Sequence, residues 1–79
     1  MNRDELMAFL EEHADDEEIE DDSSLFGEGL LDSFILIELV ALIEKSIGAK
    51  VPPLDVNLRN FDTPERILRY IETRQSEAG

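Results

Sequence analysis

Residues 32–48 of this 79-residue chain have the sequence DSFILIELVALIEKSIG, and this stretch decides the fold. Between its Asp-Ser pair and its final glycine, 10 of 14 residues are apolar, which is typical of a helix buried on most of its surface. Asp32 is a good N-cap residue, and Gly48 suits the left-handed position that ends a helix. The stretch therefore predicts a helix over residues 33–47.

This helix carries more apolar surface than a small core can cover. At about 100° per residue, its core face is formed by Leu36, Leu39, Val40, Ile43 and Ile47. A second seam lies on roughly the opposite side and is formed by Phe34, Glu38, Ala41 and Lys45. Three shorter helices cannot easily enclose both sides, so we expect apolar surface to meet a partner or a ligand. For Ile35 and Leu42, cover by the preceding loop and the last helix is an equally good explanation.

The rest of the chain predicts an all-α fold of four helices. An Asn-x-x-Glu capping box opens a helix over residues 3–13, and a Thr-Pro pair opens one over about residues 64–74. A short helix is expected over residues 55–60, and the tail 75–79 is expected to fray. No strand-like alternation competes with this pattern.

The charge of the chain is strongly acidic and unevenly distributed. It has 20 acidic and 7 basic side chains and a net charge of −13. Residues 1–44 have a net charge of −14, whereas residues 45–79 have +1. The acidic run 15–22 is interpreted as a solvated part of a long loop, with divalent-ion binding as the alternative. The negative field disfavours nucleic-acid binding and leaves an acidic helical adaptor, or a nucleic-acid mimic that binds a basic partner, as one class of function.

The chain offers little for catalysis. It has no cysteine and one histidine, His13, which excludes thiolate metal sites, a cysteine nucleophile and a His-rich metal site. His13 is interpreted as an exposed residue near a helix end. Because no acid, base and nucleophile form a convincing set, we expect no enzyme activity. The N-terminal segment has no long apolar run, so we expect a cytoplasmic protein that is not inserted in a membrane.

Ser33 follows the cap residue at the start of the apolar helix. The ordinary interpretation is that it helps to cap the helix. A helix start also presents free N–H groups and a partial positive charge, which favour a phosphate ester on this hydroxyl, and Gly27 and Gly29 leave space around it. No nearby group could activate Ser33 as a nucleophile, so modification by another enzyme explains this role better than self-catalysis.

Residues 25–34, LFGEGLLDSF, resemble the phosphopantetheine attachment region of acyl and peptidyl carrier proteins. The resemblance covers about residues 23–71. Glu38 and Glu44 fall at family-like offsets after the serine, and the later Val-Pro and Asn-Phe-Asp-Thr segments resemble the end of D-alanyl and peptidyl carrier domains. It implies a single domain over the whole chain, a four-helix bundle of acyl-carrier-protein type with a long first loop and a short third helix. In this bundle Ser33 carries 4'-phosphopantetheine.

The same resemblance implies how the carrier works. A separate Mg²⁺-dependent phosphopantetheinyl transferase moves the group from coenzyme A, and Asp32 helps to present the site to it. The terminal thiol then holds an acyl or aminoacyl cargo as a thioester, between a loading ligase and a downstream transferase or synthase. The carrier itself catalyses nothing.

Departures from the fatty-acid carrier pattern indicate which kind of carrier protein the chain resembles most. Phe34 replaces the usual leucine, and Ile35 and Lys45 stand where fatty-acid carriers are acidic. The pattern is closer to D-alanyl, aminoacyl, peptidyl or other stand-alone specialised carriers. Partner contact is expected at Phe34, Ile35, Glu38, Ala41 and Lys45. We expect a monomer, although self-association through the apolar helix stays open, as do the cargo and the pathway.

Overall fold

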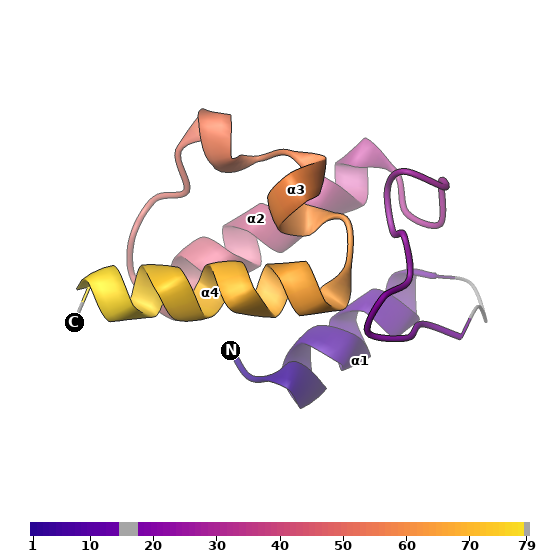
Figure 1. The fold of residues 1–79 in the computed structure, drawn as a ribbon, viewed down its shortest axis with the longest axis horizontal. Helices are drawn as coiled ribbons and strands as arrows, with labels where there is room; N and C mark the ends of the chain where they lie inside the picture. The colour runs from indigo at the N-terminus through magenta and orange to yellow at the C-terminus, as the bar shows by residue number, and fades with distance from the viewer. Residues whose placement is uncertain (15–17, 79) are drawn as a thin grey trace.

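A computed structural model of the chain describes residues 1–14 and 18–78 (Figure 1). The helices are α1 (Arg3–His13), α2 (Ser33–Ile47), α3 (Leu58–Phe61) and α4 (Pro64–Ala78), with a short 3-10 helix, η1 (Pro53–Asp55), after α2. No strand occurs in this described part of the chain. The all-α bundle of four helices expected from the sequence is therefore confirmed.

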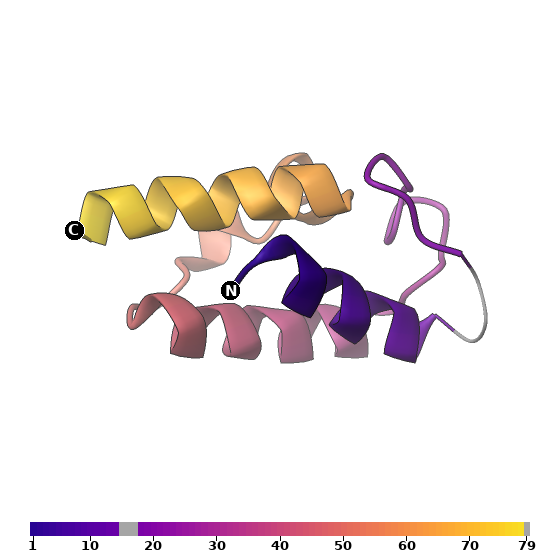
Figure 2. The same ribbon diagram turned by 90° about the horizontal axis from the view of Figure 1, so that it is seen from below.

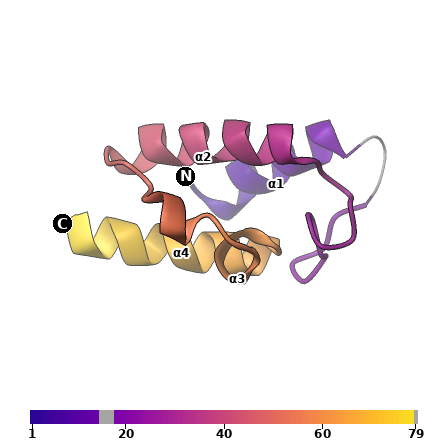
Figure 3. The ribbon, with the colours of Figure 1, turned by 90° about the horizontal axis from the view of Figure 1, so that it is seen from above.

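The helices enclose one core in two layers. α1 and α2 lie on one side of the molecule, and α3 and α4 lie on the other (Figures 2 and 3). The largest fully buried side chains are Leu6, Leu10, Leu25, Leu39, Ile43, Phe61, Pro64, Ile67 and Ile71. All four helices and the first loop contribute to this set, so the core fixes the position of each element relative to α2.

α2 begins and ends where its sequence predicts. The Asp32 side chain accepts a hydrogen bond of 3.1 Å from the Ile35 amide, and Gly48 ends the helix with a left-handed φ of 69°. Leu39 and Ile43 are fully buried. The remaining members of the predicted core face, Leu36, Val40 and Ile47, are only half-buried at its edges.

Two contacts bring both ends of the described chain to the C-terminal end of α2. The amino group of Met1 donates to the Ser46 hydroxyl, one residue before α2 ends. Near the end of α4, the Arg74 guanidinium donates at 2.9 Å to the Lys50 carbonyl, which follows α2. Ser33 lies at the other end of this helix.

The second half of the chain differs from the sequence prediction in two places. The short helix expected over residues 55–60 is replaced by η1 and α3, because the Asn57 side chain caps a new helix by accepting at 3.0 Å from the Asn60 amide. α4 runs on to Ala78, so a frayed tail was the wrong expectation for residues 75–78, whose Gln, Glu and Ala are good helix formers. Gly79 lies outside the described residues.

The loop between α1 and α2 is held by apolar contacts despite its charge. Ile19, Leu25 and Leu31 are buried in the core, and the Leu31 amide donates at 2.8 Å to the Leu25 carbonyl. Residues 15–17 of the acidic run, and with them the alternatives for that run, lie outside the described residues. Among the described helices, none has both the length and the apolar character needed to cross a bilayer.

Candidate functional site

Ser33 is the first residue of α2, and its side chain is exposed. Asp32 is also exposed. It caps the helix through one carboxylate oxygen, Oδ1, which accepts a hydrogen bond from the Ile35 amide. The free amides of the first turn and the helix dipole favour an anion at this end of α2. An enzyme can therefore reach the Ser33 hydroxyl, and a phosphate attached to it would lie in a favourable field.

A groove of about 320 Å³ adjoins Ser33 along α2. Its lining residues are Ser33, Leu36, Ile37, Val40, Ala41, Glu44 and Val56. All of them are apolar except Ser33 and Glu44, and Val56, between η1 and α3, forms the wall that α2 does not supply. The half-buried edge of the predicted core face thus lines a groove that begins at the serine.

The predicted partner residues lie on the surface of α2, with one exception. Phe34 is 73% exposed, and Glu38, Ala41 and Lys45 are exposed along the same helix. Ile35, which was expected to contact a partner, is half-buried and packs against the core. It is directed inward because its position falls between the exposed seam and the core face.

Ile37 belongs to this exposed surface, although it is not among the partner residues predicted from the sequence. Its side chain is 68% exposed and lines the groove. A signal was present in the sequence, because Ile37 follows Phe34 by three residues and precedes Ala41 by four, and residues at these spacings share a helix face. We call Phe34, Ile37, Glu38, Ala41 and Lys45 the α2 surface.

Glu38 also connects α2 to α1 through His13. The His13 Nε2 atom lies 3.4 Å from a carboxylate oxygen of Glu38, and its Nδ1 atom lies 2.9 Å from the Phe9 carbonyl oxygen. The His13 and Phe9 rings pack with centroids 4.5 Å apart. His13 is therefore half-buried between the two helices, which corrects the expectation that it is simply exposed.

Asp62 holds the loop that leads to Ser33, and nothing in the sequence pattern indicated this role. The Asp62 side chain accepts hydrogen bonds from the Ser24 hydroxyl at 2.8 Å, the Phe26 amide at 3.0 Å and the Gly27 amide at 2.8 Å. Its carbonyl accepts from the Leu25 amide at 2.6 Å. Burial acts to raise the pKa of Asp62, but these hydrogen bonds and the Arg66 charge outweigh burial and lower it.

Gly27 is required by the close packing of this clamp. A Cβ at position 27 would lie 2.8 Å from the Ser24 Oγ atom and 3.4 Å from both carboxylate oxygens of Asp62. Gly27 therefore allows a close approach of the backbone to Asp62. Gly29, with a φ of 79°, does supply a turn with open space around its Cβ position.

A polar cluster supports the groove wall from the other side. The Tyr70 hydroxyl donates at 2.7 Å to Asp55, and the Arg74 guanidinium donates at 3.0 Å to the Tyr70 oxygen. Burial, followed by the hydrogen bond to Asp55, raises the pKa of Tyr70. Because Asp55 ends η1, this cluster holds η1 and the adjacent Val56 against α4.

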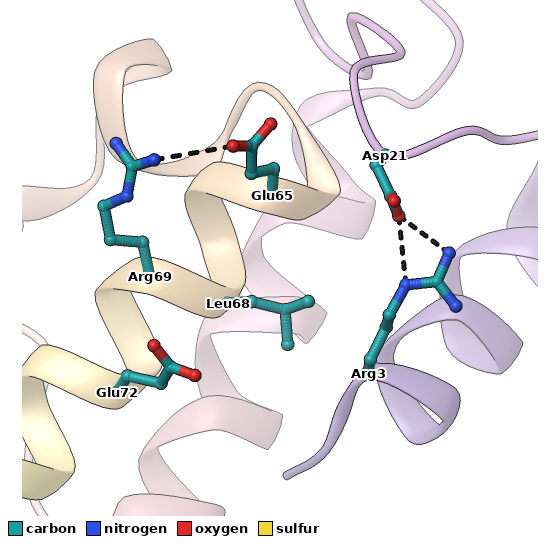
Figure 4. Close-up of a pocket in the computed structure, with 6 residues that line it drawn as sticks. All are labelled: Arg3, Asp21, Glu65, Leu68, Arg69 and Glu72. Carbon is teal, nitrogen blue, oxygen red and sulfur yellow. Dashed lines mark hydrogen bonds and ion pairs between the residues drawn. The ribbon is translucent and has the colours of Figure 1, made fainter.

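A larger depression of about 490 Å³ lies away from Ser33, between α1, the first loop and α4. Figure 4 shows its lining residues, which are Arg3, Asp21, Glu65, Leu68, Arg69 and Glu72. Arg3 donates twice to Asp21, at 2.8 and 3.0 Å, and Arg69 pairs with Glu65 at 3.5 Å (Figure 4). Its charged groups largely pair with one another, and it contains none of the predicted site residues.

The chain is similar to one family of proteins and to several individual relatives. A family model described as a phosphopantetheine attachment site matches residues 5–71. The D-alanyl carrier protein of Abiotrophia defectiva is 33% identical over 72 residues, which are 89% of this chain and 91% of that protein. The D-alanyl carrier protein of Enterococcus faecalis is 39% identical over 54 residues, or 68% of this chain and 69% of that protein.

Another relative is a much longer protein. The lincomycin biosynthesis protein LmbN of Streptomyces lincolnensis is 43% identical over 67 residues, which are 81% of this chain but 24% of that protein. The chain thus corresponds to about a quarter of LmbN. No solved structure matches the chain significantly.

Proposed function

The chain belongs to the family defined by a phosphopantetheine attachment site, and on this basis we propose that Ser33 is the residue that carries the group. As a member of this family the chain is a carrier protein, and its cofactor is covalently bound 4'-phosphopantetheine. Carrier proteins of this family are in general non-catalytic and interact with enzymes that load and transfer their cargo. The exposed hydroxyl of Ser33 at the capped start of α2 is the observation that supports the assignment.

The residues around Ser33 fit such a group. The Ser33 Oγ atom forms the phosphodiester, and the first-turn amides of α2 stabilise its negative charge. The apolar groove along α2 offers contact for an attached arm, with Val56 as its far wall. When bound, the group supplies a terminal thiol that holds cargo as a thioester, and this chain has no cysteine that could compete for the cargo.

Asp32 has two roles in this proposal. It caps α2, which fixes the direction of the Ser33 side chain, and it presents a negative charge to the phosphopantetheinyl transferase. The transferase, a loading ligase and a downstream transferase or synthase contact the α2 surface in turn. Because this surface has only one acidic side chain, Glu38, and one basic side chain, Lys45, partners recognise it mainly through the apolar Phe34 and Ile37.

We propose an aminoacyl cargo and a cytoplasmic location. Relatives that align with most of this chain are called D-alanyl carrier proteins, which supports an amino acid as the thioester-bound group. Coenzyme A, the source of the arm, is available in the cytoplasm. The chain acts as a non-catalytic monomer that other enzymes modify and load. The acidic adaptor considered from charge alone gains no support from any of these observations.

Intact-mass measurement tests the attachment residue. The chain is incubated with coenzyme A, Mg²⁺ and a broad-specificity phosphopantetheinyl transferase. We expect the mass to rise by one phosphopantetheinyl group, and Ser33→Ala to abolish this rise. Ser46→Ala, an exposed serine at the other end of α2, is the matched control and should be modified like the unaltered chain. Modification of Ser33→Ala, or no modification of the unaltered chain, would contradict the proposal.

A further inference from the structure

A basic groove of about 280 Å³ lies between α3 and α4, on elements that do not carry Ser33. Its lining residues are Arg59, Asn60, Arg66, Arg69, Tyr70 and Thr73. Three of the seven basic side chains in the sequence line it, and none of the lining residues is acidic. This concentration of positive charge occurs in a chain with a net charge of −13. The overall charge of the chain does not explain why three arginines lie together, so we looked for a function of this cluster.

The guanidinium groups of this groove are available to a ligand. Arg59 is exposed, and Arg66 is exposed and makes a long hydrogen bond of 3.4 Å to the Leu58 carbonyl. The Arg69 side chain is 74% exposed and pairs with Glu65 at 3.5 Å, a surface contact of small energy. The nearby Asp62 carboxylate already accepts three hydrogen bonds from the first loop. None of these contacts holds an arginine strongly enough to prevent a ligand from binding it.

We propose that this groove docks a short acidic segment of a partner protein. Guanidinium groups bind carboxylates through paired hydrogen bonds, and Asn60 and Thr73 add polar contacts at the rim. An extended polyanion such as a nucleic acid would soon meet the acidic surface of the rest of the chain, whereas a segment with a few carboxylates would not. Leu58 is 52% exposed next to the groove and offers an apolar contact that a small inorganic anion cannot use.

A defined peptide probes the groove directly. The ¹⁵N-labelled carrier is titrated with the peptide Glu-Glu-Leu-Glu-Glu while the Nε–H signals of its arginines are followed by NMR. We expect saturable shifts at Arg59, Arg66 and Arg69, and no saturable shifts with Gln-Gln-Leu-Gln-Gln. The double variant Arg59→Gln/Arg66→Gln should bind the acidic peptide at least about tenfold more weakly, because it loses two charge-assisted contacts.

A matched variant separates the groove from general electrostatics. Arg3→Gln/Lys50→Gln changes the net charge by the same amount outside the groove and should bind the peptide almost as well as the unaltered chain. Helix content by circular dichroism verifies folding, and Arg59→Gln alone, at an exposed position, keeps the test valid if the double variant unfolds. Modification of Ser33 is measured in parallel and should be unaffected, which keeps this proposal separate from the attachment site.

Three results would overturn the proposal. The first is the absence of saturable shifts at the groove arginines. The second is an equal loss of peptide affinity in the two double variants. The third is tighter binding of inorganic phosphate, or of a single-stranded oligonucleotide, to the same arginine signals, which would assign the groove to a small anion or to a nucleic acid instead.

Discussion

The carboxylate of Asp62, at the end of α3, accepts a hydrogen bond of 2.8 Å from the amide of Gly27, 35 residues earlier in the chain. With the bonds from Ser24 and Phe26, this contact ties the long loop to the opposite layer of the bundle. The loop leads directly into Asp32 and Ser33. One buried side chain therefore links the stability of the fold to the position at which α2 begins.

Replacing this carboxylate should destabilise the protein. Asp62→Ala leaves the Phe26 and Gly27 amides and the Ser24 hydroxyl without their acceptor, so we expect a loss of about 2 kcal/mol in the free energy of unfolding. Urea denaturation measures this value. Asp21→Ala, which removes an exposed ion pair to Arg3, is the control and should cost no more than about 1 kcal/mol. Equal losses in the two variants would show that Asp62 is not a clamp.

The clamp should also depend on pH in a defined direction. The pKa of Asp62 in the folded protein is below its usual value of 3.8, so the carboxylate contributes stability that is complete above that value. This contribution is lost as the pH falls through the lowered pKa. The difference in unfolding free energy between the unaltered chain and Asp62→Asn should therefore shrink between about pH 5 and pH 2. A difference that stays constant over this range would contradict the prediction. Both proteins contain the same other acidic residues, so the effect of protonating those residues cancels in the difference between the two unfolding free energies.

Substitutions at Asp32 separate capping from presentation of the site. Asp32→Asn keeps an N-cap oxygen and removes the charge, so we expect nearly unchanged stability and slower modification of Ser33. Asp32→Ala removes both and should lower the stability of the fold by about 1 kcal/mol as well. Thermal unfolding and the initial rate of mass gain are measured on both variants. Modification of Asp32→Asn at the original rate would limit Asp32 to capping.

The α2 surface should contribute to binding without contributing to folding. Phe34→Ala and Ile37→Ala remove side chains that are 73% and 68% exposed, so their unfolding free energies should change by less than about 1 kcal/mol. Leu39→Ala, on the buried side of the same helix, should cost about 2–5 kcal/mol. Modified Phe34→Ala and Ile37→Ala should then be loaded more slowly by the cognate ligase. Unchanged loading kinetics would exclude this surface as the docking site.

The raised pKa of Tyr70 can be observed alone, because the chain has one tyrosine and no tryptophan. Tyrosinate absorbance should give a midpoint above 10.0 while circular dichroism shows that the helices persist. Asp55→Asn should lower this pKa, since it removes a negative charge and an acceptor. Arg74→Gln should raise it, since Arg74 stabilises the phenolate. Shifts of the same sign in both variants would contradict the cluster described here.

Local signals in the sequence were sufficient to predict most of the fold. The caps of α1 and α2 involve residues three positions apart, and the predicted ranges 3–13 and 33–47 coincide with these helices. Ser33 was selected as a site residue from the same local signals and a family resemblance. The division into η1 and α3 was missed because it depends on a competition between two prolines and the Asn57 cap over a few residues.

The surroundings of the site could not be predicted from the sequence, because they depend on contacts between residues that are distant in the chain. Asp62 clamps the loop through partners 35–38 residues away, and no helical or strand spacing connects them. Val56 completes the groove only because Tyr70 and Asp55 hold η1 in place. Ile35 and Ile37 are chemically identical and two residues apart, yet Ile35 packs against the core and Ile37 is exposed.

The contacts of Met1 with Ser46 and of Arg74 with Lys50 have a practical consequence. Ser46 lies thirteen positions after Ser33 in the sequence, a distance of about 20 Å along α2 at 1.5 Å per residue. An affinity tag, a fluorophore or a sensor surface joined to either terminus would therefore stand well clear of the serine. Immobilised or fused forms of the protein should be modified at the same rate as the free chain. Its binding to partner enzymes can therefore be measured with such forms.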